Sequence, residues 1–368
     1  MIKVLFHIDT LVSGGAERVL CNLVNHMDQT KFDVTVQTVF PDDPTQFLVN
    51  GIHYKSIYPA ENQFFRNLYR IEAALGTIYA LHMKDDYDIE IAYLEAGPTK
   101  VIASSTNKKA QKIAWVHCDF DIAIRDKEKY VKKTAKHYKQ FDKVVCVSEK
   151  CKESFVSMFG DDPEVVVIHN VIDDEEIIKK AEQPLPKIVE KRKLTMCAVG
   201  RLSAPKNYIR LLSTAYRLHD EGYDFNLWMV GDGEQRDLIE EFILKHEMNS
   251  YVKVMGFQKN PYPFMKASDL LVCSSDYEGF STFITEGLIL GKPIITTDCS
   301  GMRELLGDSE YGMIVPNNDE AFYDGLKKLL SFGEEQLNCY AIMSAERGKM
   351  FSTDHLTKNT EMFFERLI

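Results

Sequence analysis

Several classes of protein are excluded by what this sequence lacks. None of its eight cysteines forms a Cys-x-x-Cys pair, so neither a zinc ribbon nor a disulfide framework is expected, and we predict reduced thiols in a cytoplasmic protein. No apolar run approaches the roughly 20 residues of a membrane-spanning helix. Basic residues do not predominate, and the net charge of -11 argues against nucleic acid as a partner, because phosphate binding favours a basic surface.

The rhythm of apolar segments predicts an α/β protein. Short apolar runs alternate with longer amphipathic ones, which is typical of parallel sheets covered by helices. In the first half, the expected strands are 2–8, 32–39, 89–93, 112–116, 143–147 and 165–168. In the second half, they are 194–199, 225–230, 252–255, 270–273, 293–296 and 312–315. Four apolar residues at helical spacing are expected to face a sheet, namely Leu68, Ile71, Leu75 and Ile78.

The length of the chain predicts two domains. Its 368 residues exceed the range in which one hydrophobic core keeps growing. Four consecutive acidic residues at 173–176 and the segment Gln183-Pro184-Leu185-Pro186 interrupt the pattern as a turn or linker. We place the boundary there, with domains over 1–185 and 186–350. Ligands of parallel sheets bind beyond the carboxyl ends of the strands, so residues that directly follow strands are the candidates for chemistry.

A glycine pair is the first such candidate. Gly14 and Gly15 follow the first strand and lead into a helical pattern. Because glycine has no Cβ, backbone N–H groups can approach an anion at a helix N-terminus, where the dipole favours negative charge. A plain strand-to-helix turn has the same appearance, so the pair alone does not decide between the two interpretations.

Two basic residues follow the first strand of the second half. Arg201 and Lys206 come after the strand that ends at Val199. A guanidinium fork and a compact ammonium together can clamp a diphosphate, and solvated loop charges are the alternative. The segment Gly231-Asp232-Gly233 lacks the third glycine of a dinucleotide fingerprint, so we interpret it as a packing or turn element.

The strongest pattern is a glutamate pair, Glu278 and Glu286, which surrounds an expected helix start. The residues at this start are Gly279, Phe280, Ser281 and Thr282. Their N–H groups would face a phosphate, and the carboxylates would accept hydrogen bonds from sugar and ribose hydroxyls. Eight helical residues span about 12 Å, which suits the distance from a ribose to a sugar across a diphosphate. Taken singly, either glutamate would be interpreted as an N-cap or a surface acid.

His117 is the candidate of the first half, because it ends a strand. A structural histidine is the alternative. Asp119-Phe120-Asp121 resembles a metal-binding D-x-D motif, but three residues are weak evidence, and we expect no metal site there.

Taken in order, these motifs resemble those of glycosyltransferase family 4, a retaining family with the GT-B fold. The resemblance covers essentially the whole chain and includes Gly-Gly-Ala-Glu-Arg at 14–18, Gly200-Arg201 and Glu-x(7)-Glu at 278–286. It implies two Rossmann-like domains that face each other across a deep cleft. The domain over 1–185 would bind the acceptor and the domain over 186–350 the nucleotide sugar, with a C-terminal helix over 351–368 crossing back to the first.

The resemblance also implies roles at the donor phosphate. Gly14 and Gly15 would contact it, while Arg201 and Lys206 would neutralise it. Ser281 and Thr282 depart from the family pattern, in which many members have glycine or small apolar residues, and this puts the sugar preference in doubt.

Further roles follow for the rest of the donor. Glu278 would hold the sugar hydroxyls, and His117 would lie near the transferred sugar. Glu286 would bind the ribose, while Gly256 and Phe257 would frame the base. The expected catalytic residues are Glu278, His117, Arg201 and Lys206.

We therefore expect a metal-independent, retaining hexosyltransferase without a cofactor. It would move a sugar from a nucleotide-diphosphate sugar, expected to be a UDP-sugar, to a glycan or lipid-linked acceptor in cell-surface polysaccharide biosynthesis. Cations and aligned N–H groups can stabilise the diphosphate leaving group. Two alternatives stay open, a GT-B epimerase or hydrolase of nucleotide sugars and a non-catalytic partner that binds sugar nucleotides.

Basic and aromatic residues of the first half predict a peripheral membrane contact. Between Arg125 and Lys143, eight basic residues stand against three acidic ones. A second group of such residues comprises Phe64, Phe65, Arg66, Tyr69 and Arg70. An anionic membrane attracts such a surface, so binding is expected at the cytoplasmic face of the inner membrane. A solvated helix face is the alternative.

Overall fold

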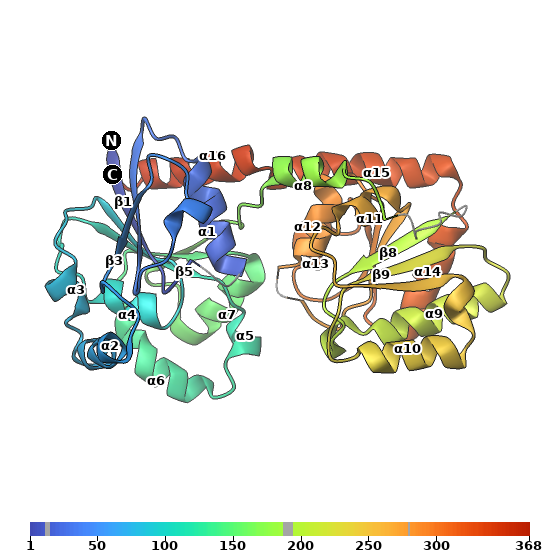
Figure 1. Ribbon diagram of the computed structural model, residues 1–368, viewed down its shortest axis with the longest axis horizontal. Helices are drawn as coiled ribbons and strands as arrows, with labels where there is room; N and C mark the ends of the chain where they lie inside the picture. Colours follow the sequence, from blue (N-terminus) through green and yellow to red (C-terminus); the bar gives the residue numbers. More distant parts are fainter. Residues whose placement is uncertain (12–14, 187–193, 279) are drawn as a thin grey trace. The chain divides into compact units, whose positions relative to one another are not determined.

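The computed structural model describes residues 1–11, 15–186, 194–278 and 280–368. They form two compact units, of which unit 1 comprises Met1–Ile172 and Thr353–Ile368 and unit 2 comprises Asp173–Ser352 (Figure 1). The division falls ahead of the predicted boundary at 185, because helix α8 (Asp174–Ala181) packs against unit 2. The acidic cluster is therefore the first turn of α8, where it complements the helix dipole.

Unit 1 contains a seven-stranded parallel sheet of order β3-β2-β1-β4-β5-β6-β7. Its strands are β1 (Ile2–His7), β2 (Phe32–Thr38), β3 (His53–Ser56), β4 (Ile89–Ala92), β5 (Gln111–Val116), β6 (Lys143–Cys146) and β7 (Glu164–Val167). The helices are α1 (Gly15–His26), α2 (Gln63–Leu75), α3 (Ile78–His82), α4 (Gly97–Ala103), α5 (Phe120–Ala123), α6 (Lys127–Tyr138), α7 (Glu149–Phe159) and α16 (Thr353–Glu365), with the 3-10 turn η1 (Pro44–Gln46). Every strand expected in this half is present, and only the edge strand β3 was not predicted.

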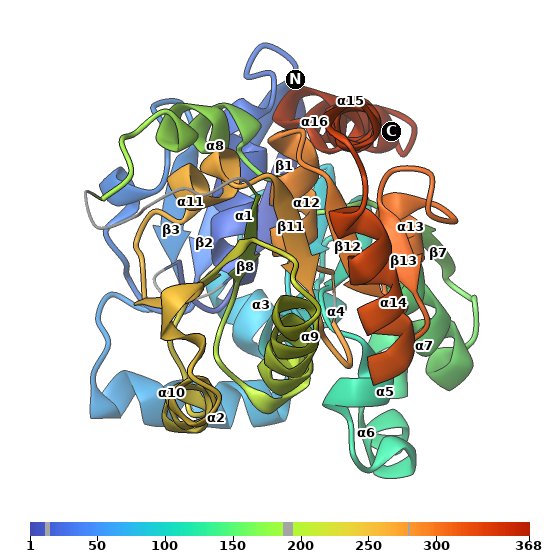
Figure 2. The same cartoon turned by 90° about the vertical axis from the view of Figure 1, so that its right-hand side faces the viewer.

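Unit 2 contains a six-stranded parallel sheet of order β10-β9-β8-β11-β12-β13. Figure 2 shows β8, β11, β12 and β13 in this order. Its strands, all of which were predicted, are β8 (Thr195–Val199), β9 (Asn226–Val230), β10 (Val252–Gly256), β11 (Leu270–Cys273), β12 (Ile294–Thr297) and β13 (Met313–Val315). After α8, the helices are α9 (Tyr208–Asp220), α10 (Arg236–Lys245), α11 (Tyr262–Ala267), α12 (Thr282–Ile289), α13 (Met302–Leu306), α14 (Asp319–Leu330) and α15 (Glu334–Gly348). The 3-10 turns are η2 (Ala204–Lys206), η3 (Met248–Ser250) and η4 (Lys349–Phe351). Among the helices of the described ranges, none combines the length and apolarity needed to cross a bilayer.

The C-terminal helix α16 completes the core of unit 1. It packs against α1, and its Phe364 is fully buried. The ring centroid of Phe364 lies 6.1 Å from that of Phe6 and 6.2 Å from that of Phe32. The first and the last elements of the chain therefore share one apolar cluster.

The prediction that Leu68, Ile71, Leu75 and Ile78 face the sheet is confirmed for two residues and wrong for two. Leu68 packs against the core, and Ile78, the first residue of α3, is buried. Ile71 and Leu75 are 58% and 70% exposed, and the helix ends at Gly76, which adopts a left-handed conformation. The buried residue is instead Glu72, whose carboxylate accepts a hydrogen bond from Tyr58 Oη at 2.6 Å and pairs with His82 Nε2 at 2.8 Å. These two polar contacts orient the helix, and a pattern of apolar residues in the sequence cannot reveal them.

Acid is expected to destabilise unit 1 through a buried histidine. His7 is fully buried in β1, and its Nδ1 lies 3.1 Å from the carbonyl oxygen of Gln37. Burial lowers the pKa of His7 to about 4, with the hydrogen bond to Gln37 opposing the shift. Since the unfolded chain binds the proton more tightly, stability is lost as pH falls from about 6.5 toward 4. His7 alone should cost about 2 kcal/mol of unfolding free energy between pH 7.5 and pH 5.

Urea unfolding at the two pH values measures this loss. Trp115 lies in unit 1 and Trp228 in unit 2, and they are the two tryptophans of the chain, so Trp228→Phe leaves a fluorescence signal from unit 1 alone. In that background, His7→Gln should show a smaller loss, because its amide does not titrate. An identical loss in both proteins would contradict the role of His7.

Candidate active site

Three strand-end loops of unit 2 are packed backbone against backbone. The N–H of Gly200 donates to Val230 O at 3.0 Å, and the N–H of Gly231 donates to Gly256 O at 2.9 Å. A Cβ on Gly231 would lie 1.8 Å from Gly200 O, and the φ of Gly231 is +149°, which L side chains rarely adopt. The prediction that the segment at 231–233 serves packing is confirmed. The backbones of the loops after β8, β9 and β10 are therefore held together at the carboxyl edge of the sheet.

Lys206 and Glu278 meet at the carboxyl edge of this sheet. Lys206 ends the turn after β8, Glu278 follows the neighbouring strand β11, and Lys206 Nζ lies 2.6 Å from Glu278 Oε1. The same oxygen accepts a hydrogen bond from Ser275 Oγ at 2.7 Å. The Glu278 side chain is only 10% exposed. Two residues 72 positions apart, both predicted to act on the donor, thus form one hydrogen-bonded pair.

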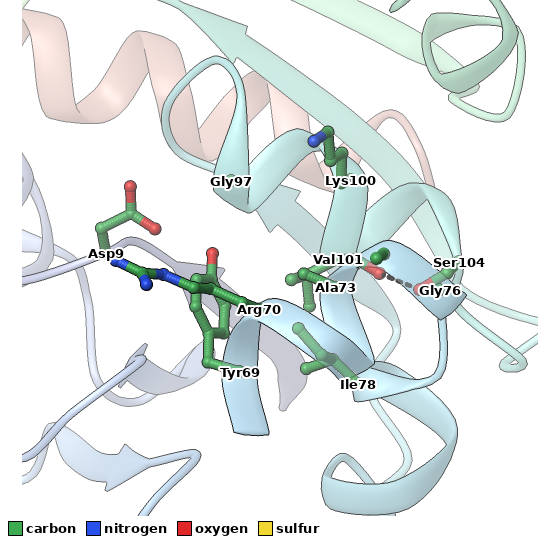
Figure 3. A pocket seen from close by; sticks show the side chains of 11 residues that line it. Asp9, Tyr69, Arg70, Ala73, Gly76, Ile78, Gly97, Lys100, Val101 and Ser104 are labelled. Atoms are coloured by element: carbon green, nitrogen blue, oxygen red, sulfur yellow. Dashed lines mark hydrogen bonds between the residues drawn. The ribbon is translucent and has the colours of Figure 1, made fainter. Parts of the chain in front are cut away.

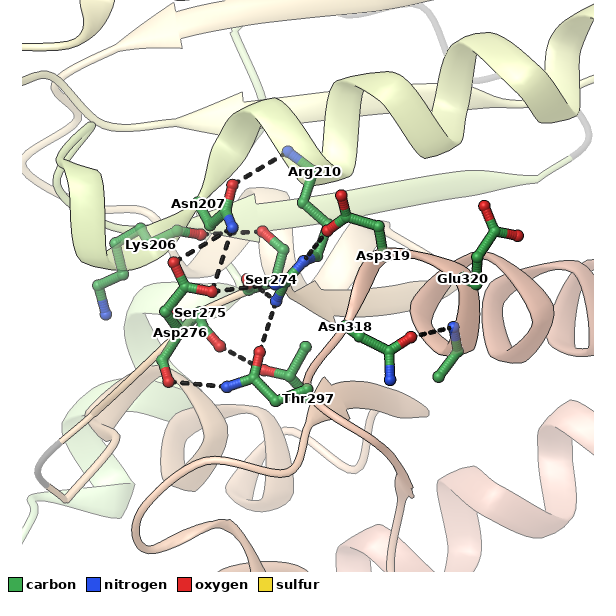
Figure 4. Close-up of polar contacts among 12 residues, drawn as sticks. Lys206, Asn207, Arg210, Ser274, Ser275, Asp276, Thr297, Asn318, Asp319 and Glu320 are labelled. Atoms are coloured by element: carbon green, nitrogen blue, oxygen red, sulfur yellow. Dashed lines mark hydrogen bonds and ion pairs between the residues drawn. The ribbon is translucent and has the colours of Figure 1, made fainter.

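A second set of contacts fastens the two loops that carry this pair. Ser274 Oγ donates to Lys206 O at 2.9 Å, and the N–H of Asp276 donates to Pro205 O at 2.8 Å. Asn207, whose φ is +44°, donates from Nδ2 to both carboxylate oxygens of Asp276 at 3.1 and 3.2 Å. Figure 4 shows Asn207 and Asp276 beside Lys206. The backbone of Lys206 is therefore held against the loop that bears Glu278.

Arg210 is the centre of this network and was not predicted. Its side chain on α9 is only 7% exposed, and its guanidinium contacts Asp319 Oδ1 at 2.8 Å and Asp276 Oδ1 at 3.0 Å. It also donates to Asn317 Oδ1 at 2.7 Å and to Ser274 O at 3.3 Å (Figure 4). The loops after β11 and β13 are thus tied to α9. An arginine at an ordinary helix position carried no signal in the sequence that distinguished it from a surface charge.

Replacing Arg210 should loosen this site. Arg210→Met keeps most of the buried volume but removes every one of these hydrogen bonds, and we expect a loss of about 1–3 kcal/mol in unfolding free energy together with lower turnover. Urea unfolding followed by Trp228 in a Trp115→Phe background measures the first effect. The matched control is Arg217→Met on the same helix, where the ion pair with Glu320 is exposed and contributes at most about 1 kcal/mol. Equal losses in both variants would contradict the role of Arg210.

Arg201 lies at the same edge but points to solvent. Its side chain is 74% exposed, and its Nε lies 3.1 Å from Glu234 Oε2. Exposed pairs of this kind are worth little, so an anionic ligand can take the place of Glu234. The structure does not bring Arg201 into the contact between Lys206 and Glu278.

Helix α12 begins beside Glu278. It starts at Thr282 with Ser281 as N-cap, so Glu278 precedes the helix and Glu286 lies inside it, as predicted. Only residues 282–286 of the segment between the glutamates are helical, so the estimate of about 12 Å for eight helical residues does not apply. Ser281 is buried, and its Oγ has no partner among the residues that the structure describes. Within the helix, Thr285 N donates to Ser281 O at 3.1 Å, and N–H groups in the first turn of a helix can bind an anion. Gly279 lies outside the described residues, and Phe280 precedes the helix.

Three further residues that were predicted to contact the donor, Glu286, Gly256 and Phe257, lie in unit 2. Glu286 is inside α12, and its Oε1 accepts a hydrogen bond from Tyr262 Oη at 3.0 Å. Gly256 ends β10 with a φ of +67°, and the ring of Phe257 after it is exposed. Tyr262 was missed, since nothing in its surroundings marks it as a partner of Glu286.

His117 and Gly15 belong to unit 1. The N–H groups of His117 and Cys118 both donate to Glu95 Oε1, at 2.6 and 3.0 Å, and this contact fixes the loop after β5 to the loop after β4. His117 Nε2 is buried without a partner in the described part of the chain. Burial lowers the pKa of His117 to about 4, although the charge of Glu95 opposes the shift, so the imidazole is neutral at pH 7. Gly15 begins α1, and Gly14 lies outside the described residues.

The D-x-D segment has a structural explanation. Asp119 is the N-cap of α5 and accepts a hydrogen bond from Asp121 N at 2.9 Å, while Asp121 pairs with Lys127 at 2.6 Å. Asp119 thus caps α5 through Oδ1, while its Oδ2 is buried without a partner among the described residues, and Asp121 is used in ion pairing.

Two family models match the chain, one in each half. "Glycosyltransferase Family 4" matches residues 13–176, and "Glycosyl transferases group 1" matches residues 179–342. The chain is a glycosyltransferase with a family 4 domain followed by a group 1 domain. Within this glycosyltransferase, the second match contains Arg201, Lys206 and both glutamates of the predicted pair.

Curated relatives extend over nearly all of the glycosyltransferase. An N-acetylgalactosamine-N,N'-diacetylbacillosaminyl-diphospho-undecaprenol 4-alpha-N-acetylgalactosaminyltransferase of Campylobacter jejuni is 27% identical, over 95% of this chain and 96% of the relative. The amylovoran biosynthesis glycosyltransferase AmsD of Erwinia amylovora is 24% identical, over 92% of each.

Among solved structures, Anabaena HepE in complex with UDP and glucose is similar with a TM-score of 0.73. The similarity covers 99% of this chain and 100% of HepE, at 17% sequence identity. The predicted GT-B fold, with two Rossmann-like α/β domains, is confirmed for this glycosyltransferase.

Proposed function

We propose that the chain is a retaining, metal-independent hexosyltransferase that moves a sugar from a UDP-sugar to a glycan or lipid-linked acceptor in cell-surface polysaccharide biosynthesis. The observation that carries the proposal is the contact between Lys206 and Glu278, which places an ammonium and a carboxylate together beside the start of α12. A sugar diphosphate needs both, a cation for its phosphates and an acceptor for its hydroxyls. The complex of HepE with UDP and glucose supports this choice of donor, and the activities of the two curated relatives support the acceptor class.

Lys206, Glu278 and the start of α12 would each bind a different part of the donor. Lys206 has three N–H donors, of which one is used on Glu278, so the others can reach a phosphate oxygen. Glu278 uses Oε1 for Lys206 and Ser275, while its Oε2 has no partner among the described residues and can accept a sugar hydroxyl. The early N–H groups of α12 would stabilise the charge that develops on the leaving diphosphate.

The transfer would proceed with retention of configuration. The bond between the anomeric carbon and the phosphate oxygen breaks, and its electron pair stays on the diphosphate. The acceptor hydroxyl oxygen then bonds to the anomeric carbon on the same face, through an oxocarbenium-like state. Its proton passes to the leaving phosphate oxygen. Neither Glu278 nor Glu286 acts as general acid or base in this scheme, and Lys206 and the N–H groups supply the charge that a metal would otherwise provide.

Nucleotide binding and product analysis test this function. Thermal melting of the full chain with UDP, GDP and ADP should show the largest rise with UDP, because a ligand that binds only the folded state stabilises it. Incubation with UDP-sugars and an undecaprenyl-diphosphate-linked saccharide should give an elongated product whose new anomeric proton in NMR has the α configuration of the donor. Epimerisation or hydrolysis of the donor in the absence of acceptor would contradict the proposal and indicate an epimerase or hydrolase. Binding of the nucleotide without any turnover would indicate a non-catalytic partner.

We also propose a peripheral contact of unit 1 with an anionic membrane. Helix α6 carries most of the basic stretch predicted from the sequence, and Phe64 on α2 is largely exposed. Vesicles with about one third anionic lipid should sediment the protein at low salt and release it at high salt, since the attraction is screened. Equal binding to anionic and zwitterionic vesicles would contradict the proposed membrane contact and indicate that α6 is a solvated helix face.

A further inference from the structure

A strained residue lies in the loop after β4 of unit 1. Ala96 has a φ of +63° and a ψ of -97°, a backbone conformation that residues other than glycine rarely adopt. Such strain persists only where the surrounding contacts hold the backbone in place, and it is concentrated at functional sites. The residues on both sides of Ala96 make contacts of this kind.

On one side of Ala96, the chain packs closely against its neighbours. Gly97 begins α4, and a Cβ at this position would lie 2.7 Å from Asp9 Oδ1 and 3.1 Å from Tyr69 Oη. Figure 3 shows Asp9 and Tyr69 beside this glycine. The backbone at the start of α4 is therefore in close contact with both side chains.

On the other side of Ala96, Glu95 reaches the loop after β5. Its Oε1 accepts hydrogen bonds from His117 N at 2.6 Å and from Cys118 N at 3.0 Å. Hydrogen bonds to a charged acceptor are about twice as strong as neutral ones. The strained loop thus delivers a carboxylate to the backbone on which His117 is carried.

The imidazole of His117 is oriented but not fully hydrogen-bonded. Its ring centroid lies 4.8 Å from that of Tyr93, which follows β4, and its Nε2 is buried without a partner among the described residues. Buried polar atoms rarely remain without a hydrogen bond, so this nitrogen can take a substrate hydroxyl as its partner. The direction of the ring depends on the backbone at 117–118, which Glu95 holds.

We infer that Glu95 is a positioning residue of the transfer reaction, which holds the backbone of His117 and Cys118 so that the imidazole of His117 meets the transferred sugar. The inference rests on the proposed function and on the role of His117 expected from the sequence. Glu95 acts through geometry, because its contacts are with main-chain N–H groups.

Three substitutions of Glu95 separate this contact from the charge. Glu95→Ala removes both and should lower kcat about 10- to 100-fold, since a small misplacement of a reacting group is costly. Glu95→Gln offers one neutral oxygen to the same two N–H groups and should remain within about threefold of the parent. Glu95→Asp keeps the charge but is one methylene shorter, so it should resemble Glu95→Ala. Full activity in Glu95→Asp with loss in Glu95→Gln would overturn the inference.

A double-mutant cycle shows whether Glu95 acts through His117. In a His117→Ala background, Glu95→Ala should lower kcat by less than about twofold, because the side chain that it positions is absent. An equal effect in both backgrounds would indicate a general loss of structure and would also overturn the inference.

Asp142→Ala is the matched control at the other end of the same strand. Asp142 Oδ2 accepts a hydrogen bond from Lys112 N at 2.8 Å near the start of β5, whereas His117 follows the end of this strand. This variant should keep the kcat of the parent, and a loss as large as that in Glu95→Ala would contradict the inference. Fluorescence of Trp115 in the Trp228→Phe background verifies that unit 1 of each variant is folded at the assay temperature.

Hydrogen exchange gives a readout that needs no turnover. The amides of His117 and Cys118 should exchange at least about tenfold faster in Glu95→Ala and at nearly the parent rate in Glu95→Gln. Unchanged exchange in Glu95→Ala would refute the positioning role. If the parent transfers no sugar, the proposed function fails, while the exchange rates still decide whether Glu95 holds this loop, so the two failures are distinguishable.

Discussion

Lys206→Ala is expected to lower turnover by about 100-fold or more. The substitution removes the ammonium that is placed to meet the leaving diphosphate, and loss of one such preorganised group typically costs two to three orders of magnitude. It also leaves Glu278, only 10% exposed, without its charged partner. Initial rates of transfer with saturating donor and acceptor measure the effect.

The control for Lys206 must separate chemistry from folding. Lys245→Ala removes an exposed lysine from α10 of the same unit and should leave the rate unchanged. Unfolding of Lys206→Ala, followed by Trp228 in the Trp115→Phe background, should remain one cooperative transition with a lower midpoint, because Glu278 loses its partner, and the rates are compared at a temperature at which both proteins are folded. Turnover within about threefold of the parent would exclude Lys206 from the donor site.

Gly231→Ala is expected to destabilise unit 2 by several kcal/mol, the largest stability effect that we predict. Its Cβ would lie 1.8 Å from Gly200 O, a backbone atom of a neighbouring strand-end loop, so the two loops must separate. The positive φ adds conformational strain of about 1–2 kcal/mol. Urea unfolding of unit 2 measures the loss, and accumulation of insoluble protein is the outcome if the unit fails to fold.

Gly222→Ala is the matched control for this prediction. Gly222 also has a positive φ, +92°, but nothing lies within 4 Å of its Cβ position. This variant carries the conformational strain without the clash and should lose only about 1–2 kcal/mol. A similar loss in both variants would show that the close approach of the loops does not matter for stability.

The strands were predictable because they are buried on both faces. Runs such as Leu270–Cys273 are apolar throughout, and a continuous apolar run between helical segments is typical of a parallel sheet. Strand β3 was missed because it lies at the sheet edge and alternates between exposed and partly buried residues. Ile71 and Leu75 on α2 were wrongly expected to be buried, because the helix instead buries Glu72, which is stabilised by two polar partners that lie elsewhere in the sequence.

The candidate site was predictable in its residues but not in their contacts. Arg201, Lys206 and Glu278 all follow strands, a position that the sequence reveals. That Lys206 and Glu278 touch each other while Arg201 turns toward Glu234 depends on side-chain geometry across long sequence separations. Arg210 escaped notice for the same reason, since its partners come from loops more than 60 residues away.

The place of helix α16 determines the order in which the chain can fold during synthesis. Unit 2 is continuous in sequence, so it can complete its core as soon as residues 173–352 have left the ribosome. Unit 1 begins to emerge first, yet Phe6 and Phe32 receive their partner Phe364 only after all of unit 2 has been translated. Unit 1 therefore cannot bury Phe6 and Phe32 against Phe364 until α16 has been made, whereas unit 2 can complete its core before that.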